Sequence, residues 1–392
     1  MGIGTWETSC AGPRRQALRR LAGVAGALSA PWVGVRAEPT IRIGLSLPLS
    51  GVPQRESALV SYLPPDLGLD FLAAFQAAVD LERHHLPISL VAMDDEFKPD
   101  RARTNLETLA RQDVIAASGL WTTEQALAAQ PVLEASGLPM VGLRSNAAEL
   151  RSGRASLLFH LRPGLDDEVA ALLATMKIAG HTRWGVVHAD NAFGRAALKA
   201  LQAQGAQVVR AVSTTAHEER AAAAAREAAH APGVQAVLIF ADGDVLAGAM
   251  AELRLRANAF LAPVCGLSNV LCTALASTRQ PAYAGFAVTS PFANPLTSRA
   301  AIAVRFREAM LAKDLDHAVR SFSAFEGFVY GTVLTRAIVA LGPRPTREAL
   351  AAALRGRTLD LGGLPIAFDE HQVGIRRVNL LYKSSSDWLL RA

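Results

Sequence analysis

Cysteine is scarce in this sequence, and the spacings with which cysteine and histidine bind metals are missing. Only three of the 392 residues are cysteine, and no CxxC, HExxH or paired Cys/His motif occurs. A GxxxxGK[ST] loop and a dinucleotide-binding GxGxxG turn are also absent. The segment Gly266-Leu267-Ser268-Asn269-Val270 begins like a nucleophile elbow but lacks its final glycine. We therefore predict no metal, no cofactor and no catalytic site, and we expect that the protein is not an enzyme.

Long apolar runs and an excess of basic charge are missing from the chain after its first 37 residues. Five of the 40 basic residues but only one of the 35 acidic residues precede Glu38. The rest of the chain is therefore nearly neutral, which disfavours a nucleic-acid partner. No later run is long and apolar enough for a membrane helix, so we expect the processed protein to be soluble.

Residues 1–37 have the features of a signal peptide. Arginines at positions 14, 15, 19 and 20 precede an apolar, small-residue run from Leu21 to Val35. The sequence Val35-Arg36-Ala37 then fits a cleavage site before Glu38. An arginine pair followed by Leu18 also resembles a twin-arginine signal, although Ala17 replaces the preferred phenylalanine. We expect export to the periplasm, by either the twin-arginine or the ordinary secretory route.

Short apolar runs alternate with amphipathic segments of helical length along the remaining chain. This rhythm predicts an α/β fold with parallel sheets covered on both faces, and the length favours two Rossmann-like lobes over one. The expected strands are Ile41–Leu47, Ile88–Met93, Val114–Ala117, Met140–Gly142, Gly185–His188, Val208–Ser213, Ala236–Ile239 and Ala262–Cys265, with strand-like segments Leu364–Phe368, Val378–Tyr382 and Trp388–Leu390 near the end. The expected helices are Leu69–Leu81, Arg101–Arg111, Glu124–Ala135, Glu168–Ala179, Gly194–Gln204, Glu218–Ala229, Val245–Leu255 and Ser298–Leu311.

Two segments that follow consecutive strands of the first half contain helix-capping residues. Thr122 and Gln125 have the spacing of a capping box, while Ser145 and Asn146 are good N-cap residues. In open α/β sheets, ligands bind beyond the carboxyl ends of strands, where helix N-termini point free N–H groups outward. The two segments are therefore either ordinary helix caps or the two halves of a carboxylate-binding cradle.

Several short segments resemble, in this order, the leucine/isoleucine/valine-binding group of type I periplasmic binding proteins. Each motif is weak alone, but their order and spacing are fairly specific and span nearly all of the chain after Glu38. They are Gly44–Gly51 with its "PLSG" turn, Met93-Asp94-Asp95 with Pro99, Leu138–Val141, His188–Gly194, Ser323–Gly327 and Gly362–Phe368.

The resemblance implies a type I periplasmic binding protein fold, with three crossovers and a ligand cleft between the lobes. Interruptions at Arg162-Pro163-Gly164, at Ser290-Pro291 and near Gly362 then suggest the boundaries. We expect an N-terminal lobe of residues 38–162 and 291–363 and a C-terminal lobe of residues 163–290 and 364–392.

The function that the resemblance implies is solute binding for an ABC importer. A monomer would deliver a small carboxylate, amino acid or amide to a permease in the inner membrane. A periplasmic sensor co-receptor with the same fold is the alternative. A secreted hydrolase is a third class, which the missing nucleophile motif disfavours.

Candidate ligand-binding residues follow from matching single positions to the family. Thr122, Ser145 and Asn146 fall where the first lobe holds a ligand carboxylate, with Trp121 and Thr123 beside them. Phe193 falls on an aromatic position of the second lobe that covers the ligand, and either Asp242 or Gly243 falls near another contact.

Two positions depart from the family. Cys265 stands at the usual glutamate that binds an ammonium, so either Asp242 or Asp244 replaces it or the solute lacks that group, since an unpaired buried charge is costly. Asp242 and Asp244 also suit an ordinary turn. Arg144 replaces a common glycine and either grips an anion or points to solvent. Cys265 and Cys272 either pair or stay free.

Overall fold

The computed structural model describes residues 40–50, 67–151, 157–215, 217–241, 243–255, 260–270, 281–384 and 388–390. Two mainly parallel sheets are present, and helices pack against both faces of each. The expected two-lobed α/β fold is thereby confirmed. The predicted signal peptide, Asp242 and Cys272 lie outside the described residues. Within the described ranges, no helix combines the length and apolar character that a membrane span requires.

The first sheet has the strand order β2-β1-β3-β4-β5, and all its pairs are parallel. In β1 the alternate residues Ile43, Leu45 and Leu47 are fully buried in one cluster, as the period of two along a strand requires. On the opposite face, a Cβ on Gly44 would meet the side chain of Leu109. The strands are β1 (Ile41–Leu47), β2 (Ile88–Asp94), β3 (Ala116–Gly119), β4 (Met140–Leu143) and β5 (Leu158–Phe159).

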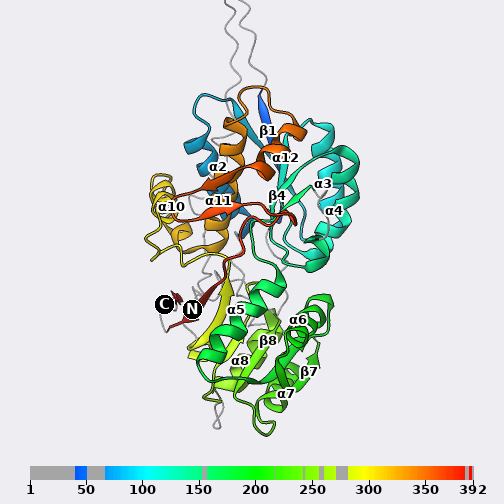
Figure 1. Cartoon of the computed structure of the whole chain (residues 1–392), viewed down its shortest axis with the longest axis vertical. Coiled ribbons are helices and arrows are strands. Elements are labelled where there is room, and N and C mark those ends of the chain that lie inside the picture. The colour runs from blue at the N-terminus through cyan, green and yellow to red at the C-terminus, as the bar shows by residue number, and fades with distance from the viewer. Residues whose placement is uncertain are drawn as a thin grey trace, which may run out of the picture. The chain divides into compact units, whose positions relative to one another are not determined.

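Helices from both halves of the chain cover the first sheet. Side chains of α2, α10, α11 and α12 share one buried cluster with it, and α3 and α4 share another. Figure 1 shows α3 and α4 on one side of β4, with α2 and α11 on the other. The bounds are α2 (Leu67–Glu82), α3 (Pro99–Arg111), α4 (Thr123–Ser136), α10 (Ala301–Leu311), α11 (Phe322–Val339) and α12 (Arg347–Gly356), with short 3-10 turns η1 (Ala148–Arg151) and η3 (Asp316–Arg320).

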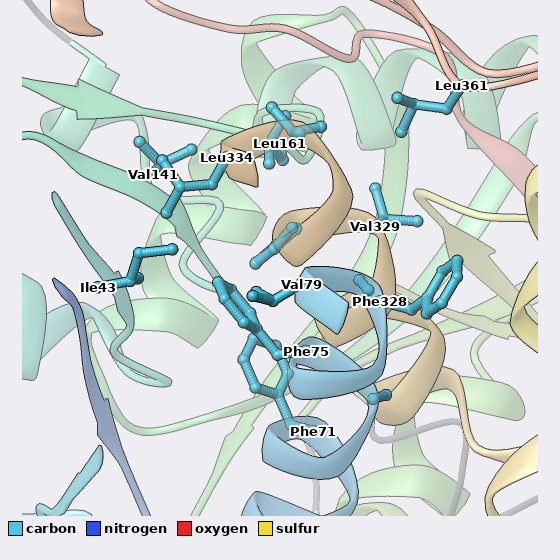
Figure 2. Close-up of a cluster of buried hydrophobic side chains, with 14 of the residues drawn as sticks. Ile43, Phe71, Phe75, Val79, Val141, Leu161, Phe328, Val329, Leu334 and Leu361 are labelled. Atoms are coloured by element: carbon cyan, nitrogen blue, oxygen red, sulfur yellow. The ribbon is translucent and has the colours of Figure 1, made fainter. Parts of the chain in front are cut away.

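Helices α2 and α11 pack closely because small residues of α11 face the backbone of α2. A Cβ on Gly327 would lie 2.4 Å from the carbonyl oxygen of Phe71, and one on Gly331 would lie 2.8 Å from that of Phe75. Figure 2 shows Phe71 and Phe75 on α2 in the same buried cluster as Phe328 of α11. This close packing fixes the position of α11 relative to the first sheet.

The second sheet has the strand order β14-β13-β10-β9-β8-β6-β7. In it, β13 pairs antiparallel with both of its neighbours, β10 and β14. Helices α5 and α6 contribute to one buried cluster with it, and α7 and α8 to another. The strands are β6 (Arg183–Ala189), β7 (Gln207–Thr214), β8 (Ala236–Phe240), β9 (Val264–Gly266), β10 (Phe286–Ser290), β13 (Asn379–Lys383) and β14 (Trp388–Leu390). The helices are α5 (Leu165–Ile178), α6 (Ala192–Ala203), α7 (Glu218–Ala229), α8 (Gly243–Leu255) and the short η2 (Pro281–Tyr283).

The first two passages between the sheets lie near the expected interruptions. Leu161 is buried with the first sheet, and Leu165 is buried with the second. Val288 is buried with the second sheet, and Phe292 returns to the cluster of the first.

The third passage lies later than the sequence suggested. β12 (Pro365–Ala367) pairs with β11 (Thr358–Asp360), and Ile366 and Ile375 are buried with the first sheet. Leu380 is the first residue beyond them that is buried with the second sheet. The expected boundary after Gly363 is therefore corrected to the segment between Ile375 and Leu380.

Candidate functional site

The carboxyl ends of β3 and β4 are neighbours because the two strands pair in the first sheet. Beyond β3, the Thr122 Oγ1 atom accepts a hydrogen bond from the backbone N–H of Gln125 at 3.1 Å. The Gln125 Oε1 atom accepts in return from the Thr122 N–H at 3.0 Å, so the predicted capping box is present. The Thr122 hydroxyl also has a proton to donate, and it donates to none of the residues that the structure describes.

A hydroxyl bridge joins the two strand ends. The Oγ1 atom of Thr123 and the Oγ atom of Ser145 are 2.8 Å apart, and Ser145 Oγ also accepts from the N–H of Ala147. One of the two hydroxyls donates within the bridge, so the other keeps a proton to donate outward. We call Thr122, Thr123 and Ser145 the hydroxyl cradle. It lies at the N-terminus of α4, where the helix dipole favours negative charge.

The Arg144 side chain lies behind the cradle. The alternative that Arg144 points to solvent is therefore corrected. Its side chain is 9 % exposed, and its guanidinium carbon lies 4.1 Å from the centre of the Trp121 ring. The Nε atom is 2.9 Å from the Glu326 Oε2 atom, an ion pair whose angle is not that of a hydrogen bond. Trp121 in turn meets Phe71 and Phe97 edge to face, so this wall of the site is rigid.

Glu326, on α11, forms ion pairs with two of the arginines behind the cradle. Besides Arg144, it accepts a hydrogen bond from Arg162 Nη1 at 3.1 Å and another from the hydroxyl of Tyr330. Burial and the adjacent Glu326 charge raise the pKa of Tyr330 well above its usual range, so the phenol stays a donor. Arg162 also donates to the Ser268 hydroxyl at 2.8 Å and thereby connects the first lobe to the end of β9.

Glu168 is the second buried carboxylate of the site. It lies in the first turn of α5 and is fully buried. Its Oε1 atom accepts from Asn146 Nδ2 at 3.0 Å and from the Ser268 hydroxyl at 2.5 Å. Its Oε2 atom accepts from the Ser268 backbone N–H at 2.9 Å and from the Thr289 hydroxyl at 2.5 Å. Asn146 therefore connects the end of β4 to the second lobe.

Arg151 adds a positive charge that pairs with no carboxylate among the residues that the structure describes. Its guanidinium donates to the carbonyl oxygens of Ser145, Ala147, Arg162 and Pro163 at distances of 3.0 to 3.3 Å. Burial lowers the pKa of Arg151 to about 10, and nearby Glu168 partly opposes that effect. The group therefore stays charged at neutral pH.

Charged groups of both signs lie close to the cradle. The guanidinium groups are Arg144, Arg151 and Arg162, and the buried carboxylates are Glu168 and Glu326. Arg144 directly precedes Ser145, and Arg151 donates to the Ser145 carbonyl oxygen, so two positive groups adjoin the cradle. Positive groups in this position favour an anion in the cradle.

The remaining predicted site residues do not join this cluster in the described structure. Phe193 lies in the first turn of α6 and is half-buried against the core of the second lobe. The Cys265 thiol is free and fully buried in that core, 3.9 Å from the Met176 sulfur, and burial raises its pKa to about 12. In this structure Cys265 therefore contributes to the core of the second lobe, and its role as a ligand contact stays a prediction. Asp242 lies outside the described residues.

The sequence did not reveal the two buried carboxylates, Glu168 and Glu326, or the residues that connect the two lobes. Arg162 was noted only as part of an interruption, and Ser268 only as part of a failed motif. Partners of these residues lie 100 or more positions away along the chain, so no local spacing shows them. The residues that sequence reasoning missed are Arg162, Glu168, Ser268, Thr289 and Glu326.

Comparison with known proteins matches nearly all of the chain after residue 39. A sequence model of the periplasmic binding protein family matches residues 40–381. No significant match is found among curated proteins.

Solved structures show the same fold. A substrate-binding periplasmic protein from Ralstonia solanacearum is 26% identical, with a TM-score of 0.72 and coverage of 90% of this chain and 100% of that one. A possible leucine/isoleucine/valine-binding protein from Rhodopirellula baltica is 22% identical, with a TM-score of 0.76 and coverage of 91% and 97%. An ABC transporter substrate-binding protein from Desulfitobacterium hafniense, solved with leucine, is 17% identical, with a TM-score of 0.71 and coverage of 90% and 100%.

Proposed function

The chain belongs to the periplasmic binding protein family, and on that premise we propose that it is the solute-binding component of an ABC importer. Its solute is a small carboxylate or amino-acid-like molecule. The observation that carries this proposal is the hydroxyl cradle at the N-terminus of α4, together with the Arg151 guanidinium that donates to the carbonyl oxygen of Ser145. The partner is a permease of the inner membrane, to which a monomer delivers the solute.

The cradle supports carboxylate binding because it offers hydroxyl donors in a partly buried setting. Thr122 keeps one proton to donate, and the bridge between Thr123 and Ser145 keeps another. Two donors suit the two oxygens of a carboxylate, and the dipole of the 14-residue helix α4 adds to the attraction. The hydroxyls of Thr122 and Ser145 also accept backbone N–H groups, which supports a binding role over a nucleophilic one.

Calorimetric titration of the processed protein with amino acids, dicarboxylates and aromatic carboxylates tests this proposal. Thr123→Val removes one cradle hydroxyl with little change in shape and is expected to weaken carboxylate binding by about 1 to 3 kcal/mol. Thr108→Val is the control, since its hydroxyl bonds only within α3. If no carboxylate binds, or if the two variants bind equally well, the site assignment fails.

Transport and sensing give different results in cells. For an importer subunit, deletion of the gene abolishes uptake of the bound carboxylate. Intact uptake combined with a lost transcriptional response would instead indicate a sensor co-receptor.

We further propose that the precursor is exported to the periplasm by the twin-arginine route and cleaved before Glu38. Replacing Arg14 and Arg15 by lysine should then retain the precursor in the cytoplasm, as detected by immunoblotting of cell fractions. Unchanged export of that variant would favour the ordinary secretory route. Mass spectrometry of periplasmic protein that retains Met1 would contradict cleavage.

A further inference from the structure

A chain of polar side chains connects the two lobes beside the first passage. In the first lobe, Glu326 pairs with Arg144 at 2.9 Å and accepts a hydrogen bond from Arg162 Nη1 at 3.1 Å. Arg162 also donates to the hydroxyl and to the carbonyl oxygen of Ser268, at 2.8 and 3.2 Å. Ser268 comes two residues after β9 of the second sheet, so the Arg162 guanidinium is bonded to both lobes.

The chain of contacts returns to the first lobe through Glu168. The Ser268 hydroxyl donates to Glu168 Oε1 at 2.5 Å, and Asn146 Nδ2 donates to the same oxygen at 3.0 Å. The two ends of the chain, Arg144 and Asn146, flank Ser145 of the hydroxyl cradle in the sequence. The contacts therefore close into a ring that crosses between the lobes twice, which we call the interlobe ring. Its members are Arg144, Glu326, Arg162, Ser268, Glu168 and Asn146.

The interlobe ring is removed from solvent. Five of its members are at most 7 % exposed, and the Arg144 side chain is 9 % exposed. A movement that separates Ser268 from Arg162 leaves a buried charge without its partner, and this is strongly unfavourable. A rotation whose axis passes through the ring keeps these distances nearly unchanged. The ring therefore permits one kind of lobe movement and opposes the others.

We propose that the interlobe ring is the pivot of lobe movement, which holds the second lobe against the first and confines their relative motion to a rotation about the ring. Three backbone passages alone would also let the lobes twist and slide, since a few backbone angles suffice for each movement. The pivot goes beyond the proposed function and does not depend on it, because every contact of the ring joins groups of the chain itself.

Distances between spin labels on the two lobes test the pivot in the processed protein without added solute. The labels are attached through Arg103→Cys on α3 and Lys199→Cys on α6, two exposed positions in different lobes. Cys272→Ser is introduced as well, whereas Cys265 is fully buried and should not react with the label. Pulsed electron spin resonance then gives the distribution of the interlobe distance.

Two variants open the ring. Ser268→Ala removes the hydroxyl that joins Arg162 to Glu168 and should widen the distance distribution by about half. Adding Asn146→Leu removes the second crossing, so the double variant should widen the distribution about twofold or more.

Ser46→Ala is the matched control, because this serine has a similar environment within a single lobe. Its hydroxyl is fully buried, donates to the buried Asp95 at 3.1 Å and accepts from Asn105 Nδ2 at 3.2 Å. The control should lose thermal stability as Ser268→Ala does, but it should leave the distance distribution unchanged.

The outcomes are distinct. If the ring variants keep the narrow distribution of the unmodified ring, or if Ser46→Ala widens it as much as they do, the ring is not the pivot. Either result leaves the proposed function to its own test, because no solute binding is measured here. Should the double variant not fold, Ser268→Ala alone decides, since it removes a single uncharged hydroxyl.

Discussion

At the scale of single residues, His160 is a histidine that the fold removes completely from water, just before the first passage between the lobes. The side chain is fully buried, and its Nε2 atom lies 3.0 Å from the carbonyl oxygen of Leu150. Its backbone joins the segments that come directly before the first and third passages, since His160 donates to Gln372 and accepts from Gly374, both at 2.8 Å. Burial, with the charge of Arg151 nearby, lowers the pKa of His160 to about 3.

We predict from this shift that the protein loses stability in mild acid. The unfolded chain takes up a proton near pH 6.5, whereas folded His160 does so only near pH 3. The contribution of His160 is thus complete above pH 6.5 and is lost as the pH falls toward 3. Between pH 6.5 and 4.5 the loss is about 2 kcal/mol in the free energy of unfolding. Urea unfolding of the wild type and His160→Gln at pH 7 and 4.5 measures it.

The glutamine amide can keep the bond to the Leu150 carbonyl, so the variant should fold and lose less stability on acidification. His85→Gln is the control, because this histidine is exposed on the loop before β2. If wild type and His160→Gln lose the same stability between the two pH values, the assignment of the acid sensitivity is wrong.

Residues of the site differ in how far the sequence reveals them. Thr122 was predictable because its partner, Gln125, is three positions away and the capping box is a local motif. The pair of Arg162 and Glu326 is separated by 164 positions, so only the fold brings them together. Whether Cys265 contacts a solute could not be read from the sequence, because the face to which a strand residue points depends on the register of the strand.

At the scale of elements, the cap of α4 has both a structural and a binding role. Thr122→Ala removes the oxygen that accepts from Gln125 and should lower the free energy of unfolding by about 1 kcal/mol. Thr346→Ala, at the N-cap of α12, removes an equivalent bond to Ala349 at 3.1 Å and should cost a similar amount. Only Thr122→Ala should also weaken carboxylate binding, as measured by calorimetry. Equal affinities of the two variants would show that Thr122 is a cap alone.

The packing of β4 against α11 depends on Gly142. It has φ of 75°, and an added Cβ would lie 2.3 Å from the ring of Tyr330, which donates to Glu326. Gly142→Ala should therefore cost about 3 kcal/mol or more, from crowding and left-handed backbone together. Gly137→Ala shares a positive φ of 61° but meets nothing within 4 Å, so it should cost only about 1 to 2 kcal/mol. Thermal and urea unfolding compare the two variants. Equal losses in the free energy of unfolding would show that crowding against Tyr330 does not contribute.

Most elements were predictable because half-buried strands and amphipathic helices carry a clear period. β1 matches its expected bounds, and α7 does as well. The helix α11 was not expected, although a motif within it was noted. Sixteen of its 18 residues are buried, so it has no polar face to give a helical period. β5 has only two residues and is too short for any periodic signal.

At the scale of the whole molecule, the site lies where the passages between the sheets meet. Arg162, on the first passage, bonds to Glu326 of the first lobe and to Ser268 of the second. Asn146 bonds in the same way to Glu168 of α5. A solute in the cradle therefore contacts groups that are directly connected to both lobes, which ties solute binding to their relative orientation.

We predict that the two lobes close around a bound carboxylate. The described chain passes between the sheets only three times, so a change at a few backbone angles can move one lobe as a rigid body. Closure buries the solute, and burial strengthens the hydrogen bonds of the cradle because water no longer competes for them. Small-angle X-ray scattering should thus show a smaller radius of gyration when a carboxylate found by calorimetry saturates the processed protein. Thr123→Val at a concentration that leaves it unoccupied is the control and should stay unchanged. An equal radius for free and saturated wild-type protein would contradict closure and would leave affinity to the cradle alone.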